Sequence, residues 1–433
     1  MALHEHPRNW AAPGVYWGAL GLGFGLAAFG LLMQRFDLVL IGMPLLLTLL
    51  LARKARPERR TQGEFRAASS EPTDVVAGPY VLSIPAAENA EYVQVRMYSP
   101  GHQTTTVVTE PRDLPLELNS KRTGPHSTFS AQARGYGHAG MWIEEAWDAQ
   151  APDAVGMPTS FALGLLPPPK KLRGLTGARH SRRIGDGGEL RDIAPMRPGD
   201  SLRRVDWRAT GRRSPELDQL YVRRTFSNAE GIAELVIDSR DDVGPDLETW
   251  RGTGVLRVDD VTSLDLARHA AASVAAALIA AGDRVGLEDL AHQRRPVASA
   301  TGQRQLRRIQ QALALSAPHG RPAEVVRPPR LPADAVIYLF STLLDDTALK
   351  LTAGWVEQGN PVIVVDTLPR VRPGRVANLV LAWRIMTMER EDRIATLRSR
   401  AIPVIPWQAA DSLVASTELT KIARAQAKTR GRR

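Results

Sequence analysis

Two apolar stretches near the N-terminus constrain this chain more than any other feature. Ala11–Met33 contains no charged side chain, and a second apolar run, Leu38–Ala52, follows after a short polar break. A helix of about 20 apolar residues spans the ~30 Å hydrocarbon layer of a bilayer. The first run is long enough, and Phe36 with a snorkelling Arg53 extends the second. The sequence therefore predicts a transmembrane helical hairpin.

Basic residues give the expected orientation of this hairpin. Five of them lie within Arg53–Arg60, directly after the second run, whereas the turn between the runs has only Arg35. The positive-inside rule places this basic flank, and all residues after Arg60, in the cytoplasm. A signal peptide and a buried hairpin of a soluble protein are the alternatives. A signal peptide is disfavoured because a second apolar run, rather than a cleavage site, follows the first.

The length and composition predict folded domains behind this anchor. The chain has 433 residues, 43% hydrophobic and 24% charged, as in globular proteins. This length corresponds to two or three domains of about 100–200 residues each. Because the chain has no cysteine, disulfides, thiolate metal sites and cysteine nucleophiles are excluded. Neither a P-loop, a His-Glu-x-x-His motif nor a Gly-x-Ser-x-Gly elbow is present.

The net charge of +10 is concentrated in three segments. Residues 53–60, 170–213 and 421–433 carry +4, +8 and +6, so the remainder of the chain is net −8. Nucleic-acid binding is not expected, because these segments have few aromatic side chains for base stacking. The tail at 421–433 has no acid and is suited to lie near anionic lipid.

The chain divides by pattern into six parts. Short strand-like runs bounded by Pro, Gly or Asn predict a small β-sandwich, and regular strand–helix alternation predicts a parallel sheet with helices on both faces. The parts are the membrane hairpin with its basic flank (1–60), a linker (61–74), the β-rich domain (75–166), a Pro/Arg-rich connector (167–231), the α/β domain (232–420) and the basic tail (421–433).

A motif in the connector resembles the signature of a bacterial family, domain of unknown function 58 (DUF58). The family pattern has a Glu/Arg-rich lead, a Gly-Asp turn, an Arg-x-x-Asp/Asn-Trp block and a nearby arginine. The matching residues are Glu189, Arg191, Pro198, Gly199, Asp200, Arg204, Asp206, Trp207 and Arg212. The resemblance implies a protein of the bacterial inner membrane with a von Willebrand factor A-like α/β domain. It also implies that the partner is a MoxR-type AAA+ ATPase or a client of one. The family that the chain resembles has no agreed enzymatic activity.

The arginine-rich stretch 173–213, which holds this motif, has two interpretations. It could be a docking surface for an acidic partner or for anionic headgroups. The favoured interpretation is a structural network, with Trp207 packed beneath paired arginines. The acids available for that pairing are Glu189, Asp192, Asp200 and Asp206.

A von Willebrand A-like domain implies a Mg²⁺ site built on an Asp-x-Ser-x-Ser loop after the first strand. Here that loop has Asp238, but Arg240 and Asp242 replace the serines. Thr301 and Thr342 are the remaining candidate oxygen ligands. Because a guanidinium only donates hydrogen bonds, we expect an Asp238–Arg240 pair in place of the metal and no cofactor.

One alternative for the loop acids stays open. Asp242, Asp259 and Asp260 could rebuild a nonstandard metal site with Asp238. Asp345-Asp346 is expected to cap the helix that begins at Thr347.

The leading functional hypothesis is a non-catalytic, membrane-anchored scaffold. It would present the strand-end surface around Asp238, Asp242 and Ser341 to another protein. The alternatives are a metal-dependent hydrolase using Asp238, Asp242 and Asp259, and a lipid- or nucleic-acid-binding module driven by charge. The sequence does not determine the oligomeric state.

Overall fold

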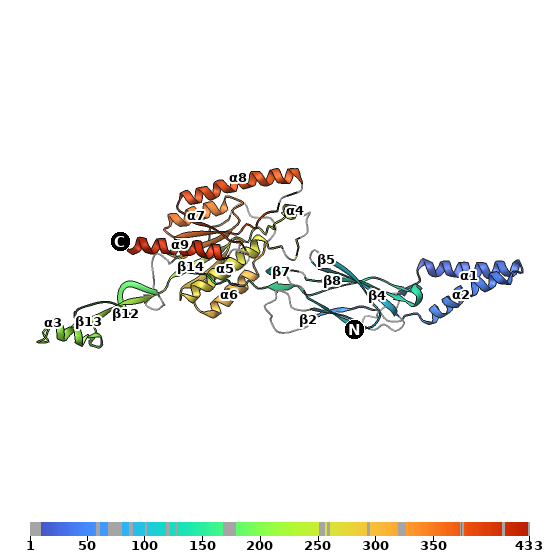
Figure 1. The fold of residues 1–433 in the computed structure, drawn as a ribbon, viewed down its shortest axis with the longest axis horizontal. Coiled ribbons are helices and arrows are strands. Elements are labelled where there is room, and N and C mark those ends of the chain that lie inside the picture. Colours follow the sequence, from blue (N-terminus) through green and yellow to red (C-terminus); the bar gives the residue numbers. More distant parts are fainter. Residues whose placement is uncertain are drawn as a thin grey trace. The chain divides into compact units, whose positions relative to one another are not determined.

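The computed structural model describes residues 10–57, 61–67, 80–85, 90–99, 102–117, 122–126, 128–167, 179–250, 256–257, 260–291, 295–318, 326–372, 374, 376–408 and 412–431. Two compact units divide the chain. The first comprises residues 1–121, 126–155 and 255–259, and the second comprises 122–125, 156–254 and 260–433. Figure 1 shows their elements.

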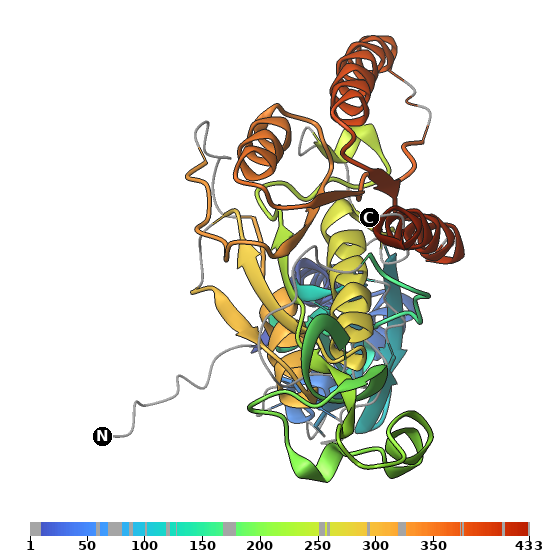
Figure 2. The ribbon, with the colours of Figure 1, turned by 90° about the vertical axis from the view of Figure 1, so that its left-hand side faces the viewer.

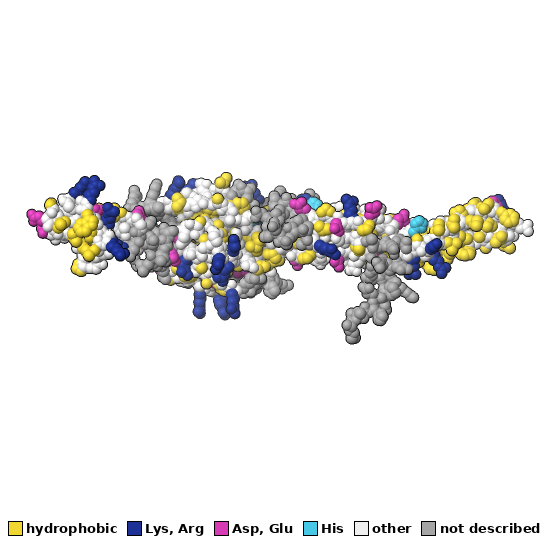
Figure 3. Space-filling view, turned by 90° about the horizontal axis from the view of Figure 1, so that it is seen from below, with side chains coloured by type: hydrophobic (Ala, Val, Ile, Leu, Met, Phe, Trp, Pro, Cys, Tyr) yellow, Lys and Arg dark blue, Asp and Glu magenta, His cyan; other side chains and the backbone are white. Residues whose placement is uncertain are grey.

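The two predicted apolar helices are present in the first unit. They are α1 (Gly14–Leu32) and α2 (Phe36–Lys54), each 19 residues long. Glycines let them pack closely, since a Cβ atom on Gly23 would lie 2.9 Å from Leu46 Cδ2 and one on Gly42 would lie 3.0 Å from the Gly23 carbonyl. Figure 3 shows many hydrophobic side chains on the outer surface of this helix pair.

Both helices are long and apolar enough to cross a membrane, which indicates membrane association. A third helix, α5 (Ser263–Ala280), has similar length and composition but is largely buried within the second unit. The first helix begins later than its apolar run, because Pro13 occupies the N-cap position. Ahead of it, β1 (Trp10–Ala11) pairs with β9 (Ile143–Glu144).

The rest of the first unit consists of two antiparallel sheets. Leu82, Val95 and Trp147 belong to one hydrophobic core that both sheets share. One sheet has β1, β9, β8 (Ser130–Gly137), β4 (Ala90–Ser99), β5 (His102–Val108) and β10 (Trp147–Gln150), and the other has β2 (Glu64–Ala67), β3 (Tyr80–Ile84) and β6 (Arg112–Leu116). The strand β2 falls in the expected linker, because its pairing with β3 uses backbone groups and requires no apolar run.

The second unit is built on the predicted, mostly parallel sheet. Its strand order is β16-β15-β14-β17-β18-β19, and only the edge strand β16 is antiparallel to its neighbour. The central strand β17 is buried along its whole length, as expected where helices cover both faces. The strands are β14 (Ile232–Ile237), β15 (Arg284–Asp289), β16 (Val297–Ala300), β17 (Val336–Ser341), β18 (Val362–Asp366) and β19 (Val404–Pro406).

Helices cover the two faces of this sheet with separate cores (Figure 1, Figure 2). On one face lie α5, α6 (Gln303–Ala314) and α9 (Ser412–Gly431). On the other lie α7 (Thr347–Glu357) and α8 (Ala377–Ser399). Short elements elsewhere are α4 (Leu247–Trp250), η1 (His138–Gly140), β7 (Gly124–His126) and β11 (Ala154–Gly156).

The expected connector contains a long antiparallel hairpin, which we call the arm. It is formed by β12 (Arg179–Pro195) and β13 (Tyr221–Ala229). Between the strands lie η2 (Leu202–Arg204) and α3 (Trp207–Arg213). The sequence did not predict this hairpin. The pairing of β12 with β13 shifts register between His180 and Asp192, so no period-two pattern marks β12.

One acid lies in the core of the sheet. Glu234 of β14 is 5% exposed, and its carboxylate occupies space left by Gly286 on the neighbouring strand. A Cβ atom on Gly286 would overlap the Glu234 carboxylate. Burial raises the pKa of Glu234 to about 7, the negative charge of Glu288 adds to the rise, and a hydrogen bond with Ser299 opposes it.

We therefore expect stability to fall as the pH rises from about 4.5 to about 7. In that window the folded protein keeps the Glu234 proton, whereas the unfolded chain loses it. This difference lowers the free energy of unfolding by on the order of 3 kcal/mol by pH 7. Thermal unfolding of the detergent-solubilised protein at several pH values measures this. Glu234→Gln should flatten the profile, whereas the control Glu357→Gln, at the exposed end of α7, should not. An unchanged profile in Glu234→Gln would contradict the assignment.

Candidate functional site

The candidate site lies where the strand order of the parallel sheet reverses, between β14 and β17. In open α/β sheets this switch point is the usual place for functional groups. Asp238 directly follows β14, and its backbone N–H donates to the Phe340 carbonyl at 2.9 Å. At the end of β17, the Ser341 hydroxyl donates to Asp238 Oδ2 at 2.9 Å. The sheet therefore brings together two residues that the sequence analysis assigned to this surface.

Arg240 occupies the centre of the site. Its side chain is 4% exposed, and it donates to Asp238 twice, from Nε at 2.8 Å and from Nη2 at 2.9 Å. Nη1 donates to Asp345 Oδ2 at 2.7 Å and to the Thr347 hydroxyl at 3.2 Å. The predicted Asp238–Arg240 pair is therefore present. These residues do not fit Mg²⁺, because a guanidinium cannot ligate a cation and already uses both Asp238 oxygens.

Asp345 is a member of the site that the sequence analysis missed. From the sequence, Asp345-Asp346 is expected only to cap α7. In the structure, Asp345 binds Arg240 and accepts from the Thr347 backbone N–H at 3.1 Å. Although burial opposes ionisation, the hydrogen bonds from Arg240 hold the pKa of Asp345 below its ordinary value. Asp346 holds the N-cap position without a capping bond and instead accepts from Arg393 at 2.6 Å.

The structure does not join Asp242 to this cluster. Its carboxylate accepts from the Leu264 backbone N–H at 3.3 Å and pairs with Arg122 at 3.3 Å. Burial raises the pKa of Asp242, nearby Asp265 raises it further, and Arg122 opposes the rise. The two acids expected to share a metal are thus bound to different arginines.

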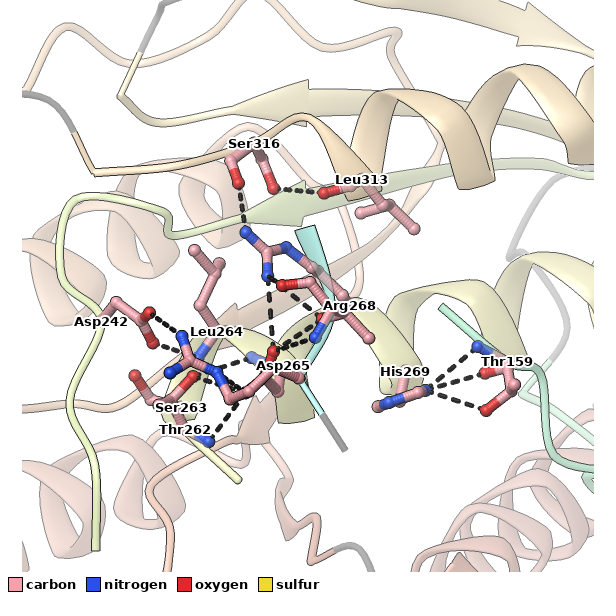
Figure 4. A network of polar contacts seen from close by, with 12 residues as sticks. Thr159, Asp242, Thr262, Ser263, Leu264, Asp265, Arg268, His269, Leu313 and Ser316 are labelled. Atoms are coloured by element: carbon pink, nitrogen blue, oxygen red, sulfur yellow. Dashed lines mark hydrogen bonds and ion pairs between the residues drawn. The ribbon is translucent and has the colours of Figure 1, made fainter. Parts of the chain in front are cut away.

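A second polar network, centred on Asp265 at the start of α5, holds Asp242 in place (Figure 4). Asp265 and Thr262 form a capping box. The fully buried Asp265 carboxylate also accepts from the backbone N–H and the hydroxyl of Thr123, both at 2.7 Å, and pairs with Arg122 at 2.8 Å. Arg268 donates to the Thr123 carbonyl at 2.6 Å and to the Ser316 carbonyl. The Thr262–Asp265 capping box follows a local sequence pattern, but no sequence signal pointed to Thr123, which lies 142 residues from Asp265.

The remaining candidate ligands do not meet at the strand ends. Thr301 is exposed just before α6, and Thr342 is buried with its carbonyl accepting from Arg390 at 2.9 Å. Asp260 pairs with Arg372, and Asp259 lies outside the described residues. Within the part of the chain that the structure describes, no group of three or more His, Asp or Glu side chains is placed to hold a metal ion.

The DUF58-like signature lies in the arm. Asp206 caps α3 by accepting from the Ala209 N–H at 3.0 Å and pairs with Arg223 at 2.7 Å. Asp200 pairs with Arg224 at 3.4 Å. Gly199 adopts a φ of 96° in the expected turn, a conformation that favours glycine. Of the other signature residues, Arg204 is half-buried, whereas Glu189, Arg191, Pro198 and Arg212 are exposed.

One part of the expected arginine network is wrong. Trp207 does not pack beneath paired arginines, because its side chain is 66% exposed. Asp206 takes the buried place beside it, since the α3 cap and the Arg223 pair both require its carboxylate. The expected pairing of acids with arginines is present at Asp200 and Asp206. Asp192 also pairs with Arg191, at a longer N–O distance of 3.9 Å.

We expect Asp265→Asn to destabilise the protein by about 3–5 kcal/mol. The change leaves the buried guanidinium of Arg268 and that of Arg122 without their shared carboxylate, and uncompensated buried charges are costly. Thermal unfolding of the full-length protein in detergent measures the effect. The control Asp392→Asn, at an exposed position of α8, should change stability by less than about 0.5 kcal/mol. Equal effects in the two variants would contradict a central role for Asp265.

One comparison with known proteins, the family model, covers part of the arm and the strand-end site. The model of the family described as "Protein of unknown function DUF58" matches residues 192–367, from β12 to the residue after β18. No curated protein and no solved structure matches the chain. Over residues 192–367 the chain therefore matches the DUF58 family model, in agreement with the resemblance of its signature.

Proposed function

We propose that this protein is a non-catalytic, membrane-anchored scaffold whose strand-end surface binds another protein. The observation that carries the proposal is the buried guanidinium of Arg240, held between Asp238 and Asp345. The chain itself supplies this cation, whose bonds to Asp238 and Asp345 link the loops after β14 and β17. A fixed surface of this kind suits recognition, because little ordering entropy is lost on binding.

The strand-end surface has an acidic, exposed rim. The side chains of Asp345, Asp346 and Glu389 are 43%, 58% and 59% exposed. A partner with basic groups would complement this rim and approach faster through electrostatic attraction. By resemblance to the family, the partner is a MoxR-type AAA+ ATPase or one of its clients.

The proposal includes a von Willebrand A-like fold for the second unit and a cytoplasmic location. A mostly parallel sheet covered by helices on both faces supports the fold. The apolar helices α1 and α2 support attachment to the inner membrane. The basic residues at 53–60 favour cytoplasmic domains by the positive-inside rule.

Divalent-cation titration separates this proposal from a metal-dependent hydrolase. Isothermal titration of the purified full-length protein with Mg²⁺ or Mn²⁺ should show no saturable binding. Arg240→Ser frees Asp238 and adds a hydroxyl, so it should gain weak binding, whereas Arg393→Ser, which removes a pair with exposed Asp346, should not. Micromolar binding by the unmodified protein that Asp238→Ala abolishes would overturn the proposal.

Affinity capture tests the scaffold role. We expect the detergent-solubilised protein to retain a MoxR-type ATPase, identified by mass spectrometry. Replacing both Asp346 and Glu389 by Lys should reduce its recovery at least tenfold, because the exposed rim becomes basic. The control Glu357→Lys changes charge at the exposed end of α7 and should leave recovery unchanged. Recovery of no ATPase under several growth conditions would contradict the proposed partner.

A further inference from the structure

We infer that the tip of the arm, residues 196–220 between β12 and β13, is a second docking surface. Its partner is a protein whose matching surface has an apolar pocket with an acidic rim. This inference does not rest on the proposed function of the strand-end surface, because the two surfaces use different residues of the second unit.

Apolar side chains at the arm tip are unusually exposed. Leu202, Trp207 and Leu217 are 69%, 66% and 58% exposed. Figure 3 shows hydrophobic and basic side chains next to each other at this end of the arm. Leu217 also has a φ of 60°, a conformation that bulky residues rarely adopt and that is found more often at functional sites. The local fold thus leaves three large apolar side chains exposed to solvent.

Hydrogen bonds hold the backbone of the arm tip, so this exposure is not the result of a frayed loop. The Asp206 N–H donates to the Tyr221 carbonyl at 2.8 Å, and the Tyr221 N–H donates to the buried Thr210 hydroxyl at 3.0 Å. Val205 forms a β-bridge with the fully buried Val222. These bonds fix the start of α3, and therefore fix the backbone of Trp207, its first residue.

The charge of the arm tip selects an acidic partner. Residues 196–220 contain six arginines and four acids, a net charge of +2. Two of the acids, Asp200 and Asp206, already pair with Arg224 and Arg223. Arg203, Arg208, Arg212 and Arg213 are among the exposed basic side chains of the arm tip.

The residue types match those that dominate binding energy in protein interfaces. Tryptophan and arginine are the commonest hot-spot residues, with the aromatic ring in a dry pocket and charged groups around it. A bilayer fits less well, because exposed Glu216 and Asp218 flank Leu217 and would face anionic headgroups. A protein surface can place a basic group against them.

Site-specific photo-crosslinking in native membranes tests this inference with the full-length chain. Benzoylphenylalanine replaces Leu202 or Trp207 in turn, and it replaces Leu381 on α8, which is 60% exposed, as a control. We expect the two tip positions to form an adduct with the same protein and Leu381 to form none with it. That protein is then identified by mass spectrometry and purified, and its affinity for the detergent-solubilised chain is measured at several salt concentrations.

Trp207→Ala should weaken this purified complex at least 30-fold, as for a hot-spot residue. Replacing Arg208 and Arg212 by Glu should weaken it and flatten its salt dependence. Unchanged thermal unfolding of the variants shows that they fold, and Trp207→Phe should recover part of the affinity. The variant with Lys at positions 346 and 389 should bind the crosslinked protein with unchanged affinity. A failure of the strand-end proposal can therefore be told apart from a failure of this inference.

Four outcomes would overturn the inference. They are no adduct at either tip position, adducts only with lipid, adducts only with a second copy of this chain, and an identified protein whose affinity is unaffected by Trp207→Ala. Lipid adducts would indicate a bilayer contact, and adducts between copies would indicate self-association.

Discussion

The buried guanidinium of Arg240 is the interaction on which the strand-end surface depends. Taking a charged group out of water costs several kcal/mol unless close, well-oriented partners compensate it. Asp238 and Asp345 provide that compensation from the loops after β14 and β17. The pairs therefore tie together the two loops that flank the reversal of strand order. A cation that belongs to the chain occupies the place where the resemblance implied a metal ion.

The same solution recurs at the start of α5. Arg122 and Arg268 surround the fully buried Asp265, and Arg122 also reaches Asp242. Every loop acid of the expected metal site that the structure describes is thus paired with an arginine. The acids at this edge of the sheet are therefore already engaged by arginines, which makes the edge poorly suited to bind a divalent cation.

Arginine has the opposite role in the arm. Asp200 and Asp206 pair with two arginines that shape the turn and α3, while Arg203, Arg208, Arg212 and Arg213 remain exposed in the same segment as Trp207. The DUF58 match covers both the arm tip and the strand-end site. A protein with two such surfaces could hold two partners, or contact one partner at two points, which strengthens binding through effective concentration.

Sequence by itself determined the elements whose signal is local. Apolar runs predicted α1 and α2, strand–helix alternation predicted the parallel sheet, and the Asp238–Arg240 pair followed from residues two positions apart. Only the tertiary structure decided that Asp345 completes the pair with Arg240, that Thr123 and Arg122 reach Asp265, and that Trp207 faces solvent. The physical reason is that periodicity records which backbone positions are buried, whereas the partner of a buried charge is chosen by packing between segments over 100 residues apart.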